Sequence, residues 1–185
     1  MRRRGFNLIA NRMLLAALVA GLVWTLYRPI RQQWLNHALI VAVKAGDVEN
    51  VKGLLDQGAS TEARSRAEPY TPADAFREAI SGHPNPYLGL TPLMLACISG
   101  REDIAQLLLQ RGARVEDRDS KDYGATALIY AAAYNHPRLV ALLIQHGANV
   151  NVNEGGWRTA SSATTNKQIQ QMLKQAGSAF IGNRR

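Results

Sequence analysis

The chain of 185 residues has a single cysteine, Cys97, and aromatic residues make up only 6% of it. One cysteine excludes an intrachain disulfide and argues strongly against a metal site built from thiolates. Because aromatic side chains are so few, a folded core has to be built mainly from Leu, Ile, Val and Ala. Neither absence identifies the compartment, since a lone buried thiol is tolerated inside and outside the cytosol.

Acidic residues are missing from residues 1–34, which carry six arginines. This segment therefore contributes +6 to the net charge of +8, whereas residues 35–185 hold 16 basic and 14 acidic side chains. The near balance of the remainder argues against a wide phosphate-binding face, so we expect no nucleic-acid partner. The basicity belongs to the N-terminus and requires a separate explanation there.

An uncharged apolar run, MLLAALVAGLVWTLY, occupies residues 13–27 and has arginines on both sides, a pattern typical of a signal peptide or a signal anchor. As a helix the run covers about 22 Å, against about 30 Å for a bilayer core. It lengthens to Gly5–Tyr27 if the guanidinium of Arg12 reaches the headgroups. The residues that follow the run, 25–29, fit a cleavage site badly. We therefore predict an uncleaved transmembrane helix over about 13–27.

The arginines also predict a topology, because basic residues favour the cytoplasmic side. Their bias towards the start of the chain indicates a single-pass protein with a cytoplasmic N-terminus and a periplasmic or extracytoplasmic C-terminal domain, facing the periplasm of a bacterium. Three alternatives stay open: cleavage that releases a secreted or periplasmic domain, a mitochondrial presequence, and a buried N-terminal helix that caps the domain.

Three segments of the chain align without gaps. They are VAVKAGDVENVKGLLDQGA at 41–59, LACISGREDIAQLLLQRGA at 95–113 and YAAAYNHPRLVALLIQHGA at 130–148. Each has Ala at its second position and ends in Gly-Ala. GLTPL precedes the second segment and GATAL the third. We expect Thr91 and Thr126 to cap helices, and Gly58, Gly112 and Gly147 to end helices in the left-handed conformation.

The pattern G-x-T-P-L-x-x-A followed by L-L-L-x-x-G-A resembles the ankyrin repeat. The resemblance implies an all-α solenoid of three to four helix-turn-helix repeats, here behind the N-terminal transmembrane helix. The repeats are expected at about 35–62, 89–121 and 124–153, with a degraded unit at 155–178 whose second helix keeps Ile169, Met172 and Leu173. The chain thus divides into an N-terminal segment, 1–34, a repeat domain, 35–178, and a tail, 179–185.

Residues 60–88 form an insertion between the first two repeats. Thr71 and Pro72 favour a short helix over 72–80, which the glycine and prolines that follow would end. In ankyrin folds this position is the hairpin between repeats, where partners often bind, although the insertion could equally be a surface loop without a role.

No chemistry is assembled in the sequence, so we expect no enzyme, no catalytic residues, no metal and no cofactor. The four histidines lack metal-ligand spacing, and His136 and His146 are interpreted as structural residues at helix ends. Glu116, Asp117, Asp119 and Asp122 cluster near a predicted hairpin, but four basic residues alternate with them. We interpret this cluster as a solvated charged hairpin rather than a cation site.

The resemblance implies that the chain binds a protein partner with its hairpin tips and with the exposed side of the first helices. The expected function is a membrane-tethered interaction module or scaffold with a monomeric domain. The alternative is a secreted or intracellular effector or inhibitor with a cleaved signal peptide. By the family pattern the partner-binding residues are Tyr87, Leu88, Leu90, Ile98, Ser99, Asp122, Tyr123, Ala125, Ala133 and Tyr134.

Overall fold

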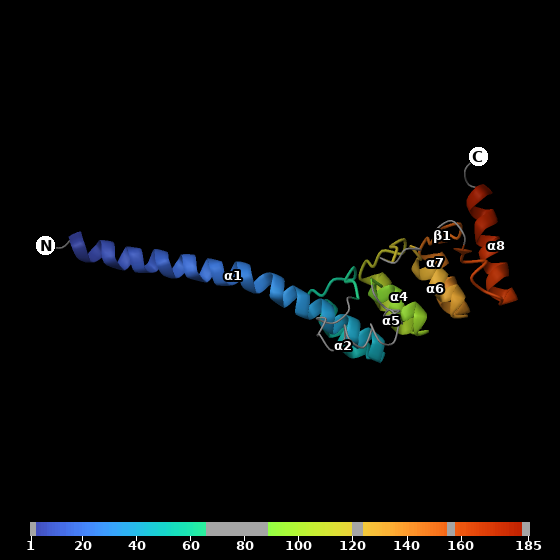
Figure 1. Cartoon of the computed structure of the whole chain (residues 1–185), viewed down its shortest axis with the longest axis horizontal. Helices are drawn as coiled ribbons and strands as arrows, with labels where there is room; N and C mark the ends of the chain where they lie inside the picture. Colours follow the sequence, from blue (N-terminus) through green and yellow to red (C-terminus); the bar gives the residue numbers. More distant parts are fainter. Residues whose placement is uncertain (1–2, 66–88, 120–123, 155–157, 183–185) are drawn as a thin grey trace, which may run out of the picture.

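The computed structural model describes residues 3–65, 89–119, 124–154 and 158–182. Helices make up most of these ranges and follow one another in pairs (Figure 1). The elements are α1 (Arg3–Ala45), α2 (Val48–Asp56), α4 (Pro92–Ile98), α5 (Glu102–Gln110), α6 (Ala127–Ala133), α7 (Pro137–Gln145), β1 (Asn153–Glu154), β2 (Arg158–Thr159) and α8 (Lys167–Gly182).

The helix pairs stack into a solenoid. The first helices of the pairs form one row, which we call the inner row, in which α4 packs against both α1 and α6. The second helices form another row, the outer row, in which α5 packs against α2 and α7, and α8 follows α7 at the end (Figure 1). This is the stacked helix-turn-helix architecture that the repeats predict, because a single pair buries its apolar face only against its neighbours.

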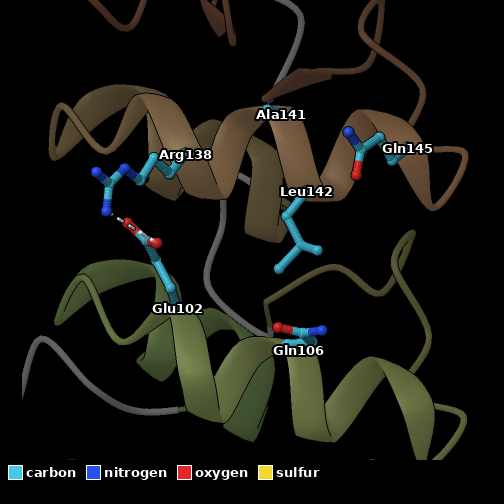
Figure 2. A pocket seen from close by; sticks show the side chains of 6 residues that line it. All are labelled: Glu102, Gln106, Arg138, Ala141, Leu142 and Gln145. Carbon is cyan, nitrogen blue, oxygen red and sulfur yellow. Dashed lines mark ion pairs between the residues drawn. The ribbon is translucent and has the colours of Figure 1, made fainter.

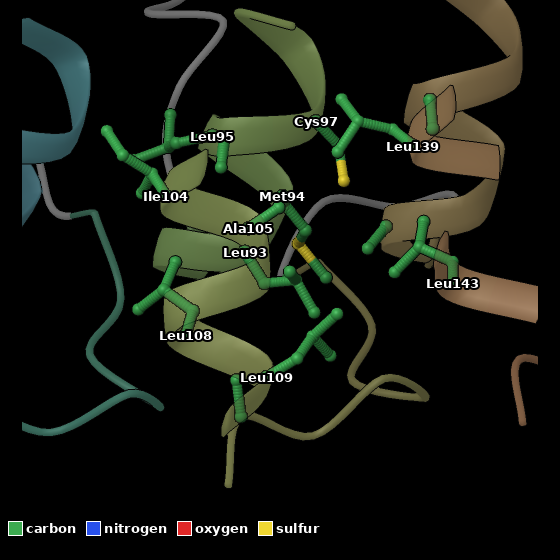
Figure 3. Packing of buried hydrophobic residues seen from close by; sticks show 14 of the residues in the cluster. Leu93, Met94, Leu95, Cys97, Ile104, Ala105, Leu108, Leu109, Leu139 and Leu143 are labelled. Atoms are coloured by element: carbon green, nitrogen blue, oxygen red, sulfur yellow. The ribbon is translucent and has the colours of Figure 1, made fainter. Parts of the chain in front are cut away.

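The core runs through the stack and consists mainly of aliphatic side chains, as the low aromatic content predicts. In the second repeat, Leu93 and Leu95 of α4 and Ile104 and Leu108 of α5 are at most 1% exposed (Figure 3). Burying a Leu or Ile side chain stabilises the folded chain by about 1.5–3 kcal/mol. Leu139 of the next repeat is equally buried, so the repeats share one core.

The helix caps confirm one threonine prediction and correct the other. Thr91 caps α4, since the backbone N–H of Met94 donates to its Oγ1 at 3.3 Å, and Pro92 follows at the first helical position. Thr126 takes the same place before α6, but its side chain makes no capping hydrogen bond. Its buried Oγ1 has no hydrogen-bond partner among the described residues. The predicted left-handed caps are confirmed, with φ of 95°, 83° and 84° at Gly58, Gly112 and Gly147.

The turn inside each helix pair is a second point of contact between repeats. Gly100 has φ of 69°, and a Cβ atom built there would lie 2.6 Å from the His136 ring of the next repeat. In the same way, the guanidinium of Arg101 packs against Gly46 and leaves no room for a Cβ atom there. Glycine is needed at Gly100 for its conformation and for the close approach of this ring. The histidine therefore has a stacking role, in line with its structural interpretation.

Helix α1 is continuous across the boundary predicted after residue 34 (Figure 1). Its C-terminal part is the first helix of the first repeat, while its N-terminal part projects away from the solenoid. Gln32 Nε2 donates to the carbonyl of Gly58 at 3.0 Å, and Asn36 Oδ1 accepts from the N–H of Ser60 at 2.9 Å. These bonds join α1 to the end of α2.

Across the described ranges, no helix combines the length and the apolar character that crossing a membrane requires. The transmembrane helix predicted over about 13–27 is therefore not confirmed. The uncharged run there extends for 15 residues, which is about 22 Å of helix.

The fourth unit is shortened. β1 and β2 pair antiparallel, with Asn153 opposite Thr159, and lead through a turn into α8. Ile169 and Leu173 of α8 are buried and Met172 is half-buried, which confirms the predicted apolar spacing. Helix α8 continues to Gly182, into the stretch predicted as a tail. The short helix predicted over 72–80 lies outside the described residues and stays a prediction.

Candidate protein-binding surface

The residues predicted to bind a partner fall into three groups in the structure. Tyr87, Leu88, Asp122 and Tyr123 lie outside the described residues, so their placement stays a prediction. Leu90 and Ala125 are buried. The remaining four lie at the ends of α4 and α6, the first helices of the second and third repeats.

The surface placement predicted for Leu90 and Ala125 is wrong, because they are 0% and 1% exposed. Both residues close the base of a hairpin and turn their side chains into the core. The N–H of Leu90 donates to Ser65 Oγ at 2.9 Å, and the N–H of Ala125 donates to Asp119 Oδ1 at 3.2 Å. The family pattern identifies the position of these two residues in each repeat. Which side chains there face the core depends on the hydrogen bonds to Ser65 and Asp119.

The ends of α4 and α6 form an exposed surface, which we call the inner-row surface: Ile98, Ser99, Ala133 and Tyr134. Ser99 and Ala133 are exposed, Tyr134 is 51% exposed, and Ile98 is half-buried. Ser99 and Tyr134 occupy the same position in successive repeats, each directly after its helix. Small residues therefore stand beside a protruding tyrosine, a side chain that is common among the strongest contacts of protein interfaces.

The acidic cluster near the hairpin is solvated only in part: Glu116 is exposed, as predicted, whereas Asp119 is buried, and Asp122 lies outside the described residues. Asp119 is 8% exposed, accepts from the N–H of Ala125, and lies 2.5 Å from the donating hydroxyl of Tyr130. Glu116 Oε1 accepts from the N–H of Asn149 in the following hairpin at 2.8 Å. These carboxylates therefore hold backbone and side-chain donors in place.

Ion pairs join neighbouring repeats along the hairpins and the outer helices. Arg64 lies 3.5 Å from Asp117, and Arg114 lies 2.7 Å from Glu62. Arg111 of the second repeat pairs with Asp56 of the first at 2.7 Å. Each of these pairs is partly exposed, so each contributes little stability, about 0–1 kcal/mol. Together they explain why basic and acidic residues alternate in this stretch.

A shallow groove of about 230 Å³ runs between α5 and α7 (Figure 2). Leu142 projects towards it from α7, and Gln106 lies opposite on α5. Glu102 and Arg138 close one end with an ion pair at 3.7 Å. Because the walls are two stacked helices, α5 and α7, and the ion pair is largely exposed, the groove is a seam between repeats.

In the described ranges, no group of three or more His, Cys, Asp and Glu side chains could hold a metal ion. Burial raises the pKa of the Cys97 thiol to about 12, because desolvation disfavours the thiolate. A thiol in this state is a poor nucleophile. His136 Nε2 lies 3.4 Å from the carbonyl of Ile98, in the contact between repeats described above.

The family model for ankyrin repeats, in three copies, matches residues 39–154 of the chain. The chain belongs to the ankyrin-repeat family. Ankyrin repeats indicate a protein–protein interaction module. The matched region begins within α1 and ends at the β1–β2 hairpin.

Relatives of this ankyrin-repeat chain include the mouse B-cell lymphoma 3 protein homolog, which is 45% identical over 65 residues. Human ankyrin repeat and KH domain-containing protein 1 is 35% identical over 117 residues, and rat ankyrin repeat and SAM domain-containing protein 6 is 36% identical over 72. The matches cover 35%, 63% and 39% of this chain, but only 14%, 4% and 8% of these much longer relatives.

The sequence analysis missed a second groove, of about 570 Å³, between α1 and α2 at the start of the solenoid. Trp34 and Val41 of α1 line it, and they are 62% and 47% exposed. Their signal in the sequence is the seven-residue spacing between two large apolar residues, Trp34 and Val41.

Proposed function

We propose that this chain is a membrane-tethered ankyrin module that binds a protein partner on the inner-row surface. The observation that carries the proposal is the exposure of Tyr134. Of the eight large hydrophobic side chains that the described residues leave exposed, seven belong to α1 and the eighth is Tyr134. A tyrosine that stands out from the repeat stack beside small residues offers a large contact area at a low cost in side-chain entropy.

The neighbours of Tyr134 support this choice of surface. The hairpin charges are engaged between repeats, and the groove between α5 and α7 is a stacking seam. Leu90 and Ala125 are excluded by burial, so Ile98, Ser99, Ala133 and Tyr134 make up the described part of the site. The hairpin residues Tyr87, Leu88, Asp122 and Tyr123 extend it by family analogy.

The experiment compares the full chain with two exposed variants, Tyr134→Ala and Gln110→Ala, as baits in proximity capture. Gln110 lies on the outer row at the end of α5 and serves as the matched control. We expect a specific partner to bind the wild type and Gln110→Ala alike, and to bind Tyr134→Ala about tenfold more weakly, as for a loss of roughly 1–2 kcal/mol. Equal binding of all three baits would assign the partner to another surface.

The tether is proposed for the projecting part of α1. Met13, Leu15, Leu18 and Trp24 are each more than 60% exposed. Apolar side chains gathered on one element mark a contact with lipid or protein. Basic residues flank them, and the guanidinium of Arg28 lies 5.9 Å from the centre of the Trp24 ring. Aromatic and basic side chains together are typical of the headgroup region.

The proposed topology has a cytoplasmic N-terminus and the ankyrin repeats on the other side of the membrane. Flotation of the full chain with lipid vesicles tests attachment, and a reporter at the C-terminus tests the side. Failure to float would refute the tether and leave the partner surface untouched. A mature N-terminus near residue 22 or 28 would instead identify a released effector.

A further inference from the structure

The exposed face of α1 carries an apolar stripe that recurs at alternating spacings of four and three residues. This spacing is the seven-residue repeat by which two helices pack along a common seam. We call it the α1 stripe. Its described members are apolar except for Arg31, and all are exposed or half-buried: Met13, Ala17, Ala20, Trp24, Arg31, Trp34, Ala38, Val41 and Ala45. The side chain at position 27, which completes the series between Trp24 and Arg31, lies outside the described residues.

The pattern is most informative in the segment 31–45. Polar residues are frequent there, unlike in the apolar run at 13–27, so a continuous row of apolar side chains is not expected from composition alone. Gln33 and Lys44 are exposed beside the stripe and do not interrupt it. Leu35 and Leu39 face the opposite way, into the core of the first repeat, and are at most 1% exposed. The helix therefore has two apolar faces in this segment. One is covered by its own solenoid and the other is open.

The open face is one wall of the groove between α1 and α2. Trp34, Ala38, Val41 and Ala45 line it from α1, and the opposite wall is α2, with Leu54 and Gly53 at its centre. The pair α4–α5 has a helix pair packed on each side, whereas in the described ranges the pair α1–α2 contacts a pair only on the side of α4–α5. The groove is thus the unstacked end of the solenoid.

We propose that a second copy of this chain covers the α1 stripe, with the two α1 helices side by side and parallel. A second copy presents the same seven-residue repeat, so the two surfaces are complementary to each other by two-fold symmetry. Each α1 then lies against the stripe of its partner and enters the groove beside the partner's α2. In a parallel arrangement each position of the stripe lies beside the same position of the partner, from Met13 to Ala45, and both repeat domains lie at the same end of the seam.

The dimensions fit a dimer. From Met13 to Ala45 the stripe is about 48 Å long and a helix is about 10 Å wide, so the seam alone covers roughly 500 Å² on each copy. A standard interface covers about 800 Å² per partner. The wall that α2 adds to the groove supplies further area, which is why the groove and the seam belong to one interface.

The proposed lipid tether does not account for this face. Trp34 and Val41 lie beyond Arg28 and Arg31, on the part of α1 that packs into the solenoid. A single basic residue in an otherwise apolar seam, here Arg31, is a known means of fixing register. The part of the seam at 34–45 is independent of the tether, although attachment of both copies to one membrane would raise their effective concentration. The proposed dimer differs from the monomeric domain expected from the sequence.

Cysteine cross-linking of the full chain in mild detergent tests the proposal. Val41→Cys places a thiol on the stripe, and Gln33→Cys places one on an exposed position of the same helix outside it. Cys97 is buried and serves as a silent background. We expect Val41→Cys to form a disulfide-linked dimer at least about tenfold faster than Gln33→Cys, because a disulfide needs Cα atoms within about 7 Å.

A second variant, Val41→Lys, tests the same contact without cross-linking. Because Val41 is half-exposed in one copy, the helix content of the chain should be unchanged, and light scattering after size exclusion should show a monomer where the wild type is a dimer. A monomeric wild type, or equal cross-linking at 33 and 41, would overturn the proposal. Protection of a thiol at 41 from a water-soluble maleimide by vesicles, without a cross-link, would assign the face to lipid and overturn it as well. Vesicle flotation separates these results from failure of the tether.

Discussion

Replacement of Asp119 by alanine should destabilise the repeat domain more than any single surface substitution. The carboxylate accepts from the N–H of Ala125 at 3.2 Å and from the hydroxyl of Tyr130 at 2.5 Å, with 8% of the residue exposed. Hydrogen bonds to a charged group contribute about 1.5–3 kcal/mol each, so loss of two should lower the free energy of unfolding by roughly 3 kcal/mol. That is a large part of the 5–15 kcal/mol typical of a domain.

Urea unfolding followed by circular dichroism measures this effect, and a double-mutant cycle assigns it. Tyr130→Phe removes one of the two bonds and should cost about 1.5 kcal/mol, and the double variant should cost less than the sum of the single variants. Glu62→Ala, which removes an exposed ion pair, is the control and should stay within about 1 kcal/mol of the wild type. If Asp119→Ala is as stable as this control, the carboxylate is solvated and the interpretation of the hairpin fails.

Three further predictions concern the repeats. Gly100→Ala should lower the free energy of unfolding by more than about 1 kcal/mol, since φ is positive at this residue and the new Cβ meets the His136 ring. Adding His136→Ala to the same chain should recover part of this loss in urea unfolding. Thr91→Val should lower stability by about 1 kcal/mol through loss of the cap, whereas Thr126→Val should be neutral or stabilising, because its hydroxyl is buried without a partner. Cys97 should react with a maleimide at pH 8 only as fast as the fold opens, because burial raises its pKa to about 12; rapid labelling in native buffer would contradict its burial.

The local pattern of the sequence was sufficient for most of the fold. The Gly-Ala endings located each second helix, and the left-handed conformation of Gly112 follows from its place after α5. The cap at Thr91 was predicted correctly because its donor, Met94, is three residues away. Features of this kind depend on neighbours along the chain, which a sequence displays directly.

Features that depend on distant neighbours were predicted poorly. From the sequence, Asp119 was predicted to be a solvated acid, but in the structure its carboxylate accepts a hydrogen bond from the hydroxyl of Tyr130. Ala125 was predicted to be a surface residue, but its N–H donates to Asp119 and its side chain is buried. The domain boundary after residue 34 was set by charge and apolarity, whereas the backbone of α1 is continuous through it. At the candidate site, the family pattern located Tyr134 but could not separate it from the buried positions Leu90 and Ala125.

The continuity of α1 fixes the direction in which the proposed binding surface points. A helix turns by about 100° per residue, so one residue inserted before Arg28 would rotate the whole solenoid by that angle about the helix axis. An insertion of seven residues would restore the original heading to within about 20° and move the repeats roughly 10 Å further out. The number of helical residues between the apolar run and the first repeat therefore sets two quantities. It determines the direction in which Tyr134 faces around the axis of α1, and it determines how far the repeats lie from the projecting segment.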